Sequence, residues 1–206
     1  MILAIDTSVG ISVAIHDGTE TVSEFSTGQH GSQGELTAKY IQSLLDDADC
    51  FAKDIRTVLV GVGPGPFTGL RVGITTALTF AHALQIPVHG ICSLDAVGFT
   101  QSKECIVVSD ARRKELYWAR YQDRIRVSEP AVDKPNQISN LLNNLSVIGP
   151  AAQMYPEFFT GELVELRAGF LADLYVSELA EIKPVLPLYL RKPDAVEPVG
   201  VKQVLR

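Results

Sequence analysis

Three consecutive residues near the start of the sequence carry the oxygen atoms that phosphate or metal chemistry needs. Asp6, Thr7 and Ser8 directly follow the apolar run "ILAI". A carboxylate at the end of a buried strand can hold a magnesium ion through water, and neighbouring hydroxyls can contact a phosphate. We therefore interpret Asp6, Thr7 and Ser8 as candidate nucleotide-binding residues, the remnant of a fuller site.

A glycine-rich turn, "GVGPGPFTGLRVG" at residues 61–73, provides a second candidate phosphate site. The free N–H groups at the start of a helix can bind a phosphate where glycine lets it approach. However, the turn has neither the lysine of a P-loop nor the glycine spacing of a dinucleotide-binding turn. Two interpretations stay open: a phosphate-binding turn, and a rigid turn set by Pro64 and Pro66.

A second loop, "SDARRKE" at residues 109–115, is the expected partner of the first turn, because Asp110 also follows an apolar run. This loop has no glycine, so its side chains keep a phosphate away from the backbone. Its basic residues Arg112, Arg113 and Lys114 suit either an anion site or a solvated turn. The sequence therefore predicts no ATP turnover by the chain alone and no cofactor of its own; ATP or ADP is expected only at an interface with a partner.

The histidines and cysteines do not form a recognisable catalytic or metal-binding set. No two histidines stand four residues apart, the spacing that places both rings on one face of a helix; they are His16, His30, His82 and His89. This spacing argues against a metal site and a zinc protease. The three cysteines are far apart, which argues against a disulfide framework and favours a reducing cytoplasm; they are Cys50, Cys92 and Cys105.

The overall charge limits the partners that the chain can bind alone. The net charge is −6 at pH 7. An acidic chain is a poor stand-alone binder of nucleic acid, because neutralisation of phosphates dominates that affinity. If RNA is involved, we therefore expect a partner protein to supply the positive surface. We expect no membrane association, because no apolar run reaches spanning length.

The order of apolar periods predicts an α/β fold with two related halves. Three strands open the chain, and helices and strands then alternate; the expected elements are strands 2–6, 10–18 and 20–27, helix 35–48, strand 57–62, helix 70–84, strand 86–91 and a short helix from Ser93 to Thr100. The stretch "ECIVVSDARRKELYWARYQD" at 104–123 repeats the pattern of the opening residues. It is followed by a helix near 135–142, strand 145–148 and helix 168–181. The sequence thus predicts two subdomains, each with a mixed sheet and helices, at 1–103 and 104–190, and an extended tail at 191–206.

The helix expected at 70–84 is apolar on nearly all sides. Arg71 is its single formally charged residue, and small residues recur four apart at Gly69, Gly73, Ala77 and Ala81. A helix of this kind is covered on both sides. One cover is its own sheet, and the other is either helix 35–48 of the same chain or another subunit.

Several motifs together resemble the TsaB family of glycoprotease-like proteins. They are "ILAIDTS", "GVGPGPFTGLRVG", "SLDA", "DARRKELYWARY" and "PLYLRKPDA", in this order along nearly the whole chain. The resemblance implies an actin-like ATPase (ribonuclease H-like) fold. It also implies a non-catalytic, cytoplasmic subunit that is required for threonylcarbamoyladenosine formation at position 37 of tRNA.

The same resemblance implies the partners and favours one surface. The expected partners are a TsaD homologue, which is the transferase, and a TsaE homologue, which is an ATPase; a homodimer is expected in isolation. Contact with tRNA is expected to be indirect, through this complex. The implied partner interface comprises Leu36, Tyr40, Leu44, Gly69, Leu70, Arg71, Gly73, Ile74, Ala77 and Ala81. Two features depart from the family pattern: Pro66 stands where many members have serine, and His30 is displaced from its expected position before the first helix. An active small-molecule kinase or ATPase of the actin-like class is the alternative.

Overall fold

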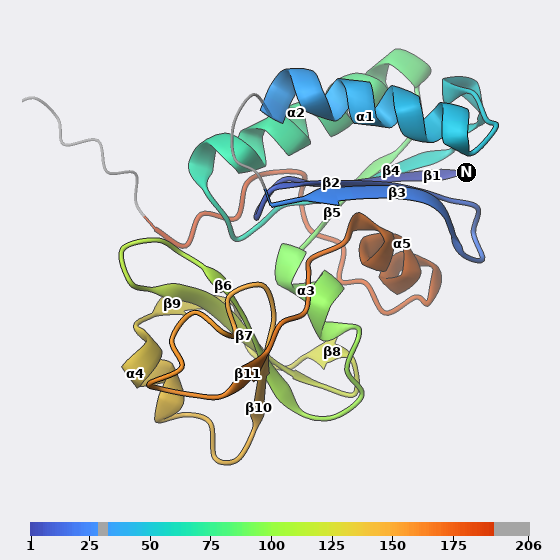
Figure 1. Ribbon diagram of the computed structural model, residues 1–206. Coiled ribbons are helices and arrows are strands. Elements are labelled where there is room, and N and C mark those ends of the chain that lie inside the picture. Colours follow the sequence, from blue (N-terminus) through green and yellow to red (C-terminus); the bar gives the residue numbers. More distant parts are fainter. Residues whose placement is uncertain (29–32, 192–206) are drawn as a thin grey trace, which may run out of the picture.

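The computed structural model describes residues 1–28 and 33–191. The predicted tail beyond residue 191 and the His30 region lie outside these ranges. Two sheets form the framework, with helices on both faces of the first (Figure 1). The first half contains β1 (Ile2–Asp6), β2 (Ile11–His16), β3 (Thr21–Thr27), α1 (Gln33–Asp47), a 3-10 turn (Ala52–Asp54), β4 (Thr57–Gly61), α2 (Phe67–Leu84), β5 (Val88–Ile91) and α3 (Ser93–Gly98). The second half contains β6 (Cys105–Asp110), β7 (Leu116–Gln122), β8 (Ile125–Arg126), β9 (Ala131–Asp133), α4 (Pro135–Ser139), β10 (Ser146–Ile148), β11 (Gly161–Glu162) and α5 (Ala168–Val176).

The first sheet is mixed and has the order β3-β2-β1-β4-β5. Strand β1 is antiparallel to β2 and parallel to β4. Every residue of β1 is buried, because α1 and α2 cover one face of the sheet and α5 covers the other (Figure 1). A strand that is covered on both faces has a continuous run of apolar residues in its sequence, which explains "ILAI".

The second sheet repeats the beginning of the first. Its order is β11-β10-β6-β7-β8, with β9 paired to β7. Strands β6 and β7 are antiparallel, as are β1 and β2, and β6 is parallel to β10, as β1 is to β4. The predicted α/β fold with two related, mixed sheets is confirmed.

Helix α5 lies on the first sheet although it follows the second in the chain. Its buried residues Ala168, Leu171, Ala172 and Leu174 pack with Ile2, Ala4, Ala14 and Leu59. The division of the chain into units at 1–103 and 104–190 stays a prediction. Helix α5 belongs to the range 104–190 but packs into the core of the first sheet, within the range 1–103.

The small residues of α2 face the interior of the chain. Leu70, Ile74, Ala77 and Ala81 are buried, and a Cβ atom at Gly73 would collide with the Thr7 hydroxyl oxygen. The close approach that glycine and alanine allow is therefore to β1 and its following turn. Within the chain, the predicted interface residues on α2 other than Arg71 are thus buried, and their assignment to a partner interface stays a prediction; they are Gly69, Leu70, Gly73, Ile74, Ala77 and Ala81.

The helical part of the predicted interface on α1 is also largely internal. Leu44 is buried, and Leu36 and Tyr40 pack against the same core. The Tyr40 ring stacks on Phe25 of β3, with 3.7 Å between ring centroids. Within the residues assigned to the interface, Arg71 is the one that the structure places on the surface. None of the helices in residues 1–28 and 33–191 has the length and apolarity to cross a membrane.

Candidate functional site between the two sheets

The Asp6 carboxylate is bound on both oxygens by other groups of the chain. Its Oδ1 accepts hydrogen bonds from the Ser8 N–H at 2.7 Å and the Ser8 hydroxyl at 2.6 Å. Its Oδ2 accepts from the Ser93 hydroxyl at 2.6 Å, and the Ser93 oxygen in turn accepts from the Gly63 N–H at 3.0 Å. Asp6 therefore joins the end of β1, the glycine-rich turn and the start of α3.

Burial dominates the electrostatics of this carboxylate. The side chain is almost inaccessible to solvent. Desolvation raises the pKa of Asp6 above its ordinary value, and the hydrogen bonds from Ser8 and Ser93 oppose this effect in part. The serines thus stabilise an ionised group that the interior disfavours. Helix α3 begins at Ser93, as predicted; Cys92 occupies the cap position, and the Ser93 hydroxyl contacts Asp6.

The Thr7 hydroxyl is inserted into the hydrogen-bonding pattern of α2. It donates to the Gly69 carbonyl at 2.7 Å and accepts from the Gly73 N–H at 3.1 Å. These two backbone groups are four residues apart, which is the pair that an α-helix joins directly. The Thr7 side chain can reach them because Gly73 carries no Cβ atom, which would lie 2.3 Å from the Thr7 hydroxyl oxygen. Thr7 thereby fixes α2 to the end of β1.

The two candidate turns share one hydrogen bond, from a backbone N–H to the aspartate two residues earlier. In the second half, the Arg112 N–H donates to Asp110 Oδ1 at 2.7 Å, as the Ser8 N–H does to Asp6. Arg112, Arg113 and Lys114 then all adopt positive φ, at 62°, 55° and 61°. The aspartates thus organise their own turns.

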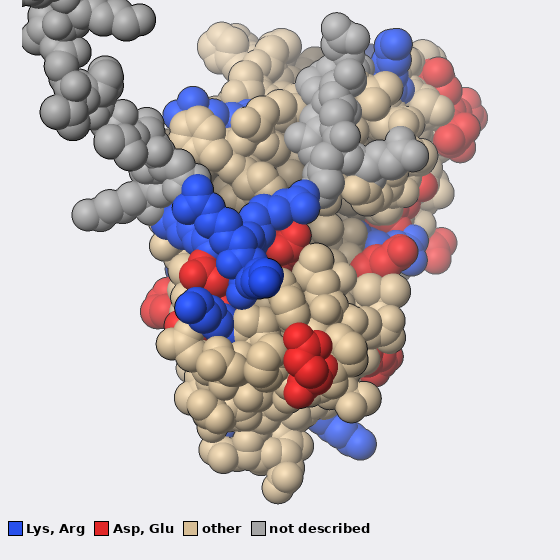
Figure 2. All heavy atoms as spheres, turned by 60° about the vertical axis from the view of Figure 1, so that its left-hand side comes forward, with Lys and Arg blue, Asp and Glu red and all other residues tan. Residues whose placement is uncertain are grey.

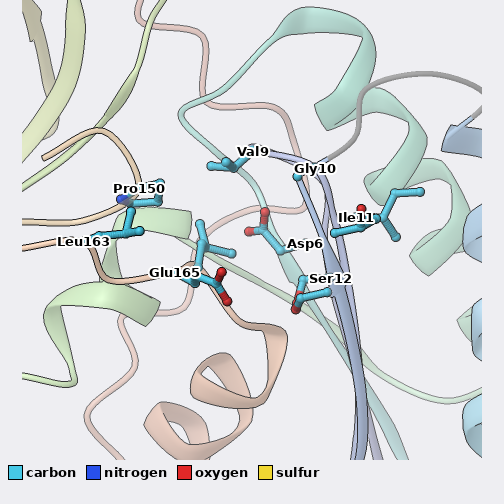
Figure 3. A pocket seen from close by; sticks show the side chains of 12 residues that line it. Asp6, Val9, Gly10, Ile11, Ser12, Pro150, Leu163 and Glu165 are labelled. Atoms are coloured by element: carbon cyan, nitrogen blue, oxygen red, sulfur yellow. The ribbon is translucent and has the colours of Figure 1, made fainter. Parts of the chain in front are cut away.

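A cleft lies between the β1–β2 turn and the second half (Figure 3). Its walls comprise Asp6, Val9, Gly10, Ile11, Ser12, Ser26, Thr27, Gly28, Pro150, Leu163, Glu165 and Leu166. Its two ionisable groups are the Asp6 and Glu165 carboxylates, and none of these lining residues is basic. Ser12 and Ser26 are bonded to each other at 2.6 Å, and the Ser12 oxygen also accepts from the Ala168 N–H. A polyphosphate bound here would meet carboxylates without a compensating cation from these walls.

A different cluster of side chains stands on the surface at the start of α2. The Phe67 ring stacks on Tyr189, with 5.0 Å between centroids, and the Arg71 guanidinium lies 3.7 Å from the Phe67 centroid. The Arg71 Nε donates to the Tyr189 hydroxyl at 3.2 Å. Phe67 and Tyr189 remain 42% and 38% exposed. Tyr189 was not anticipated, because 118 residues separate it from Arg71 and no local pattern connects them.

The paired hairpins, mixed sheets and aspartate-ended first strands define an actin-like ATPase type of fold. A family profile described as TsaD, tRNA N6-adenosine threonylcarbamoyltransferase, matches residues 33–195. The TsaB protein of Bacillus subtilis is 33% identical over 84% of this chain and 76% of its own length. An uncharacterized protein of Mycobacterium tuberculosis H37Rv is 38% identical over 97% of this chain and 95% of its own length. The chain belongs to the TsaB branch of this family.

Solved structures agree with this assignment. YeaZ from Pseudomonas aeruginosa superposes with a TM-score of 0.72 and 25% identity, covering 92% of this chain and 99% of that one. Relatives also differ in length: the chain spans 56% of a Mycobacterium leprae protein to which it is 39% identical.

Proposed function

We propose that the protein is a non-catalytic subunit required for threonylcarbamoyladenosine formation at position 37 of tRNA. The relatives from Bacillus subtilis and Escherichia coli are named as tRNA threonylcarbamoyladenosine biosynthesis proteins. The main support for a non-catalytic role is that Ser8 and Ser93 donate hydrogen bonds to both oxygens of the Asp6 carboxylate. Groups that hold the fold together in this way are not available to a substrate.

An active kinase or ATPase of the actin-like class receives less support from the geometry. Such chemistry needs cations or metal ligands around the phosphates. In the cleft, both oxygens of the Asp6 carboxylate, the group that could hold a metal ion, are bonded to Ser8 and Ser93. The Thr7 hydroxyl is occupied by α2, and none of the lining residues is basic. We therefore propose that the chain has no cofactor of its own, and that ATP or ADP meets it only at an interface with a partner.

The outer face of α2 is the proposed docking surface for a TsaD homologue and, in its absence, for a second copy. Beyond Arg71, its exposed residues carry no formal charge: Thr75, Leu78, Thr79, His82 and Ala83. A charge-poor helix face matches the core of protein interfaces. The TsaE homologue is proposed to join this complex. We place the assembly in the cytoplasm, in keeping with the free cysteines Cys50, Cys92 and Cys105.

Nucleoside mass spectrometry of tRNA tests the pathway. A strain depleted of this protein is expected to lose threonylcarbamoyladenosine, and complementation with the gene restores it. Full modification in depleted cells would overturn the proposed function. The purified chain alone is expected to hydrolyse ATP far below about 1 s⁻¹, the low end of ordinary enzyme rates.

Substitutions on α2 test the docking surface. Thr75→Glu and Leu78→Glu place a charge on the outer face without entering the core. They are expected to abolish co-purification with the TsaD homologue while circular dichroism stays unchanged. Val127→Glu is the matched control, because Val127 is exposed near β8 of the other half. Equal binding by all three variants would place the docking surface elsewhere.

A further inference from the structure

One extended segment connects the start of α2 with the loop between β6 and β7. The Leu188 N–H donates to the Val62 carbonyl at 2.8 Å, at the entrance to the glycine-rich turn. The next residue, Tyr189, accepts a hydrogen bond from Arg71 through its hydroxyl. The Arg191 guanidinium donates to the Ala111 carbonyl at 3.0 Å. The segment 188–191 thus brings residues of both halves onto one surface. We call this surface the basic face; it comprises Phe67, Arg71, Tyr189, Arg191 and loop 112–114.

The basic face concentrates positive charge on a chain that is acidic overall. Figure 2 turns forward the side of the molecule from which loop 112–114 projects in Figure 1, and one dense group of Lys and Arg side chains lies there. Asp110 pairs with Arg112 and Glu115 pairs with Arg191. Arg113 also has an interaction partner within the protein. The excess is therefore one of formal charge: segments 110–115 and 189–191 hold four basic and two acidic residues, and Arg71 adds a further cation.

The conformation of loop 112–114 projects its side chains outward. Three successive non-glycine residues in the left-handed region are unusual, since a side chain costs about 1 kcal/mol or more there. The Asp110 carboxylate holds the first of them through the Arg112 N–H. Arg112, Arg113 and Lys114 are all exposed as a result. The turn therefore presents consecutive cations to a ligand outside the chain.

Aromatic rings lie next to these cations. The stacked Phe67 and Tyr189 rings are partly exposed, and Arg71 lies on the Phe67 ring. Exposed aromatic rings interleaved with basic side chains are typical of surfaces that bind unpaired nucleotides, where bases stack on rings and phosphates meet cations. A protein partner would more readily use the charge-poor face of α2 described above.

We propose that the basic face binds RNA directly, with phosphates on loop 112–114 and Arg191 and an unpaired base beside Phe67 and Tyr189. The proposal rests on the proposed function only in naming tRNA as the source of this RNA. It adds a direct contact where the resemblance implied an indirect one. The acidic remainder of the surface would repel other parts of the nucleic acid, so binding is confined to this face.

Fluorescence anisotropy with a fluorescein-labelled tRNA anticodon stem-loop tests the proposal on the full chain. The double variant Arg113→Ala/Lys114→Ala is expected to bind at least about tenfold more weakly at moderate salt. It is also expected to lower the slope of log affinity against log salt by about 1.4, because each single-strand phosphate contact contributes about 0.7. The charge-preserving Arg113→Lys/Lys114→Arg variant should bind as the wild type does.

A matched control removes the same charge elsewhere. Lys53→Ala/Lys103→Ala changes two exposed lysines outside the basic face and is expected to leave binding unchanged. Phe67→Leu, which keeps the charge but loses the ring, should weaken binding with no change in the salt slope. Both results would support the proposal.

Three outcomes would overturn it. They are a wild-type chain that does not bind the stem-loop, equal losses in the Ala double variant and its control, and a loop variant that loses the TsaD homologue in a pull-down while retaining RNA. The last outcome would make the basic face a protein-docking surface. None of them bears on whether depleted cells lose the modified nucleoside, so failure of this proposal is distinguishable from failure of the proposed function.

Discussion

Arg126 and Asp95 form an ion pair inside the protein, with the Arg126 Nε 2.8 Å from Asp95 Oδ1. The side chains are 6% and 8% exposed. The Tyr121 hydroxyl donates to the same oxygen at 2.6 Å, and Arg126 also pairs with Glu181. The pair connects α3, beneath the first sheet, to β7 and β8 of the second. It therefore contributes to the relative position of the two halves.

Loss of Asp95 should strongly destabilise the fold. Asp95→Ala leaves the buried Arg126 guanidinium without this partner, and the free energy of unfolding should fall by about 3–5 kcal/mol. Urea denaturation followed by circular dichroism measures the change. Glu129→Ala is the control, because Glu129 contacts the same arginine but its side chain is 89% exposed; it should cost less than about 1 kcal/mol. Equal effects would show that the buried pair has no special role.

Gly73→Ala should destabilise the monomer, and Gly73→Glu should prevent folding. The new Cβ atom would displace the Thr7 hydroxyl from its bonds to α2. We expect a net loss of about 1–3 kcal/mol for the alanine, even though alanine favours a helix by about 1 kcal/mol. Thermal unfolding with light scattering distinguishes this from a subunit contact: a folded Gly73→Glu monomer would contradict the buried position. Thr75→Ala, on the exposed side of the same helix, should have little effect.

The raised pKa of Asp6 gives a defined pH dependence. Below 3.8, the ordinary value for aspartate, the group is neutral in the folded and unfolded chain alike. As the pH rises above 3.8, the unfolded chain ionises first, so stability falls until the folded pKa is passed. Asp6→Asn should remove this loss, and the difference in unfolding free energy should move in favour of the variant with rising pH. A constant difference across this range would contradict the burial effect.

The three cysteines should differ in reactivity. Burial raises the pKa of Cys105 to about 11 and that of Cys92 well above its ordinary range. Cys50 is half-buried and its pKa is raised as well, so it should react with Ellman's reagent at pH 8, but slowly. All three thiols should react in denaturant. In the native Cys50→Ser variant, labelling should be negligible; fast labelling there would show that the interior opens.

Local patterns in the sequence were sufficient to predict most elements and the repeat. The apolar runs that lead to Asp6 and Asp110 form strands β1 and β6 as expected. Both aspartates accept a hydrogen bond from the turn that follows. Helix α2 begins at Phe67, three residues before the predicted start at Leu70, because the glycine-rich turn ends at Pro66.

Contacts between distant segments were beyond such patterns. The stripe of Gly73 and Ala77 indicates close packing, but its period cannot tell whether the neighbour is another subunit or β1. Nor does any local signal connect Ser93 with Asp6, 87 residues away. Arg126 likewise looks like an ordinary hairpin residue until the fold brings it to Asp95. In each case the partner is set by topology, which depends on the whole chain.

The late position of α5 has a consequence for synthesis on the ribosome. The face of the first sheet that carries Ile2, Ala4, Ala14 and Leu59 is covered by residues that emerge only after the second sheet has been made. At about 5–20 residues per second, this apolar face stays open to solvent for on the order of ten seconds. During that interval the nascent chain exposes apolar surface of the kind that chaperones protect, and release before α5 would leave an aggregation-prone fragment.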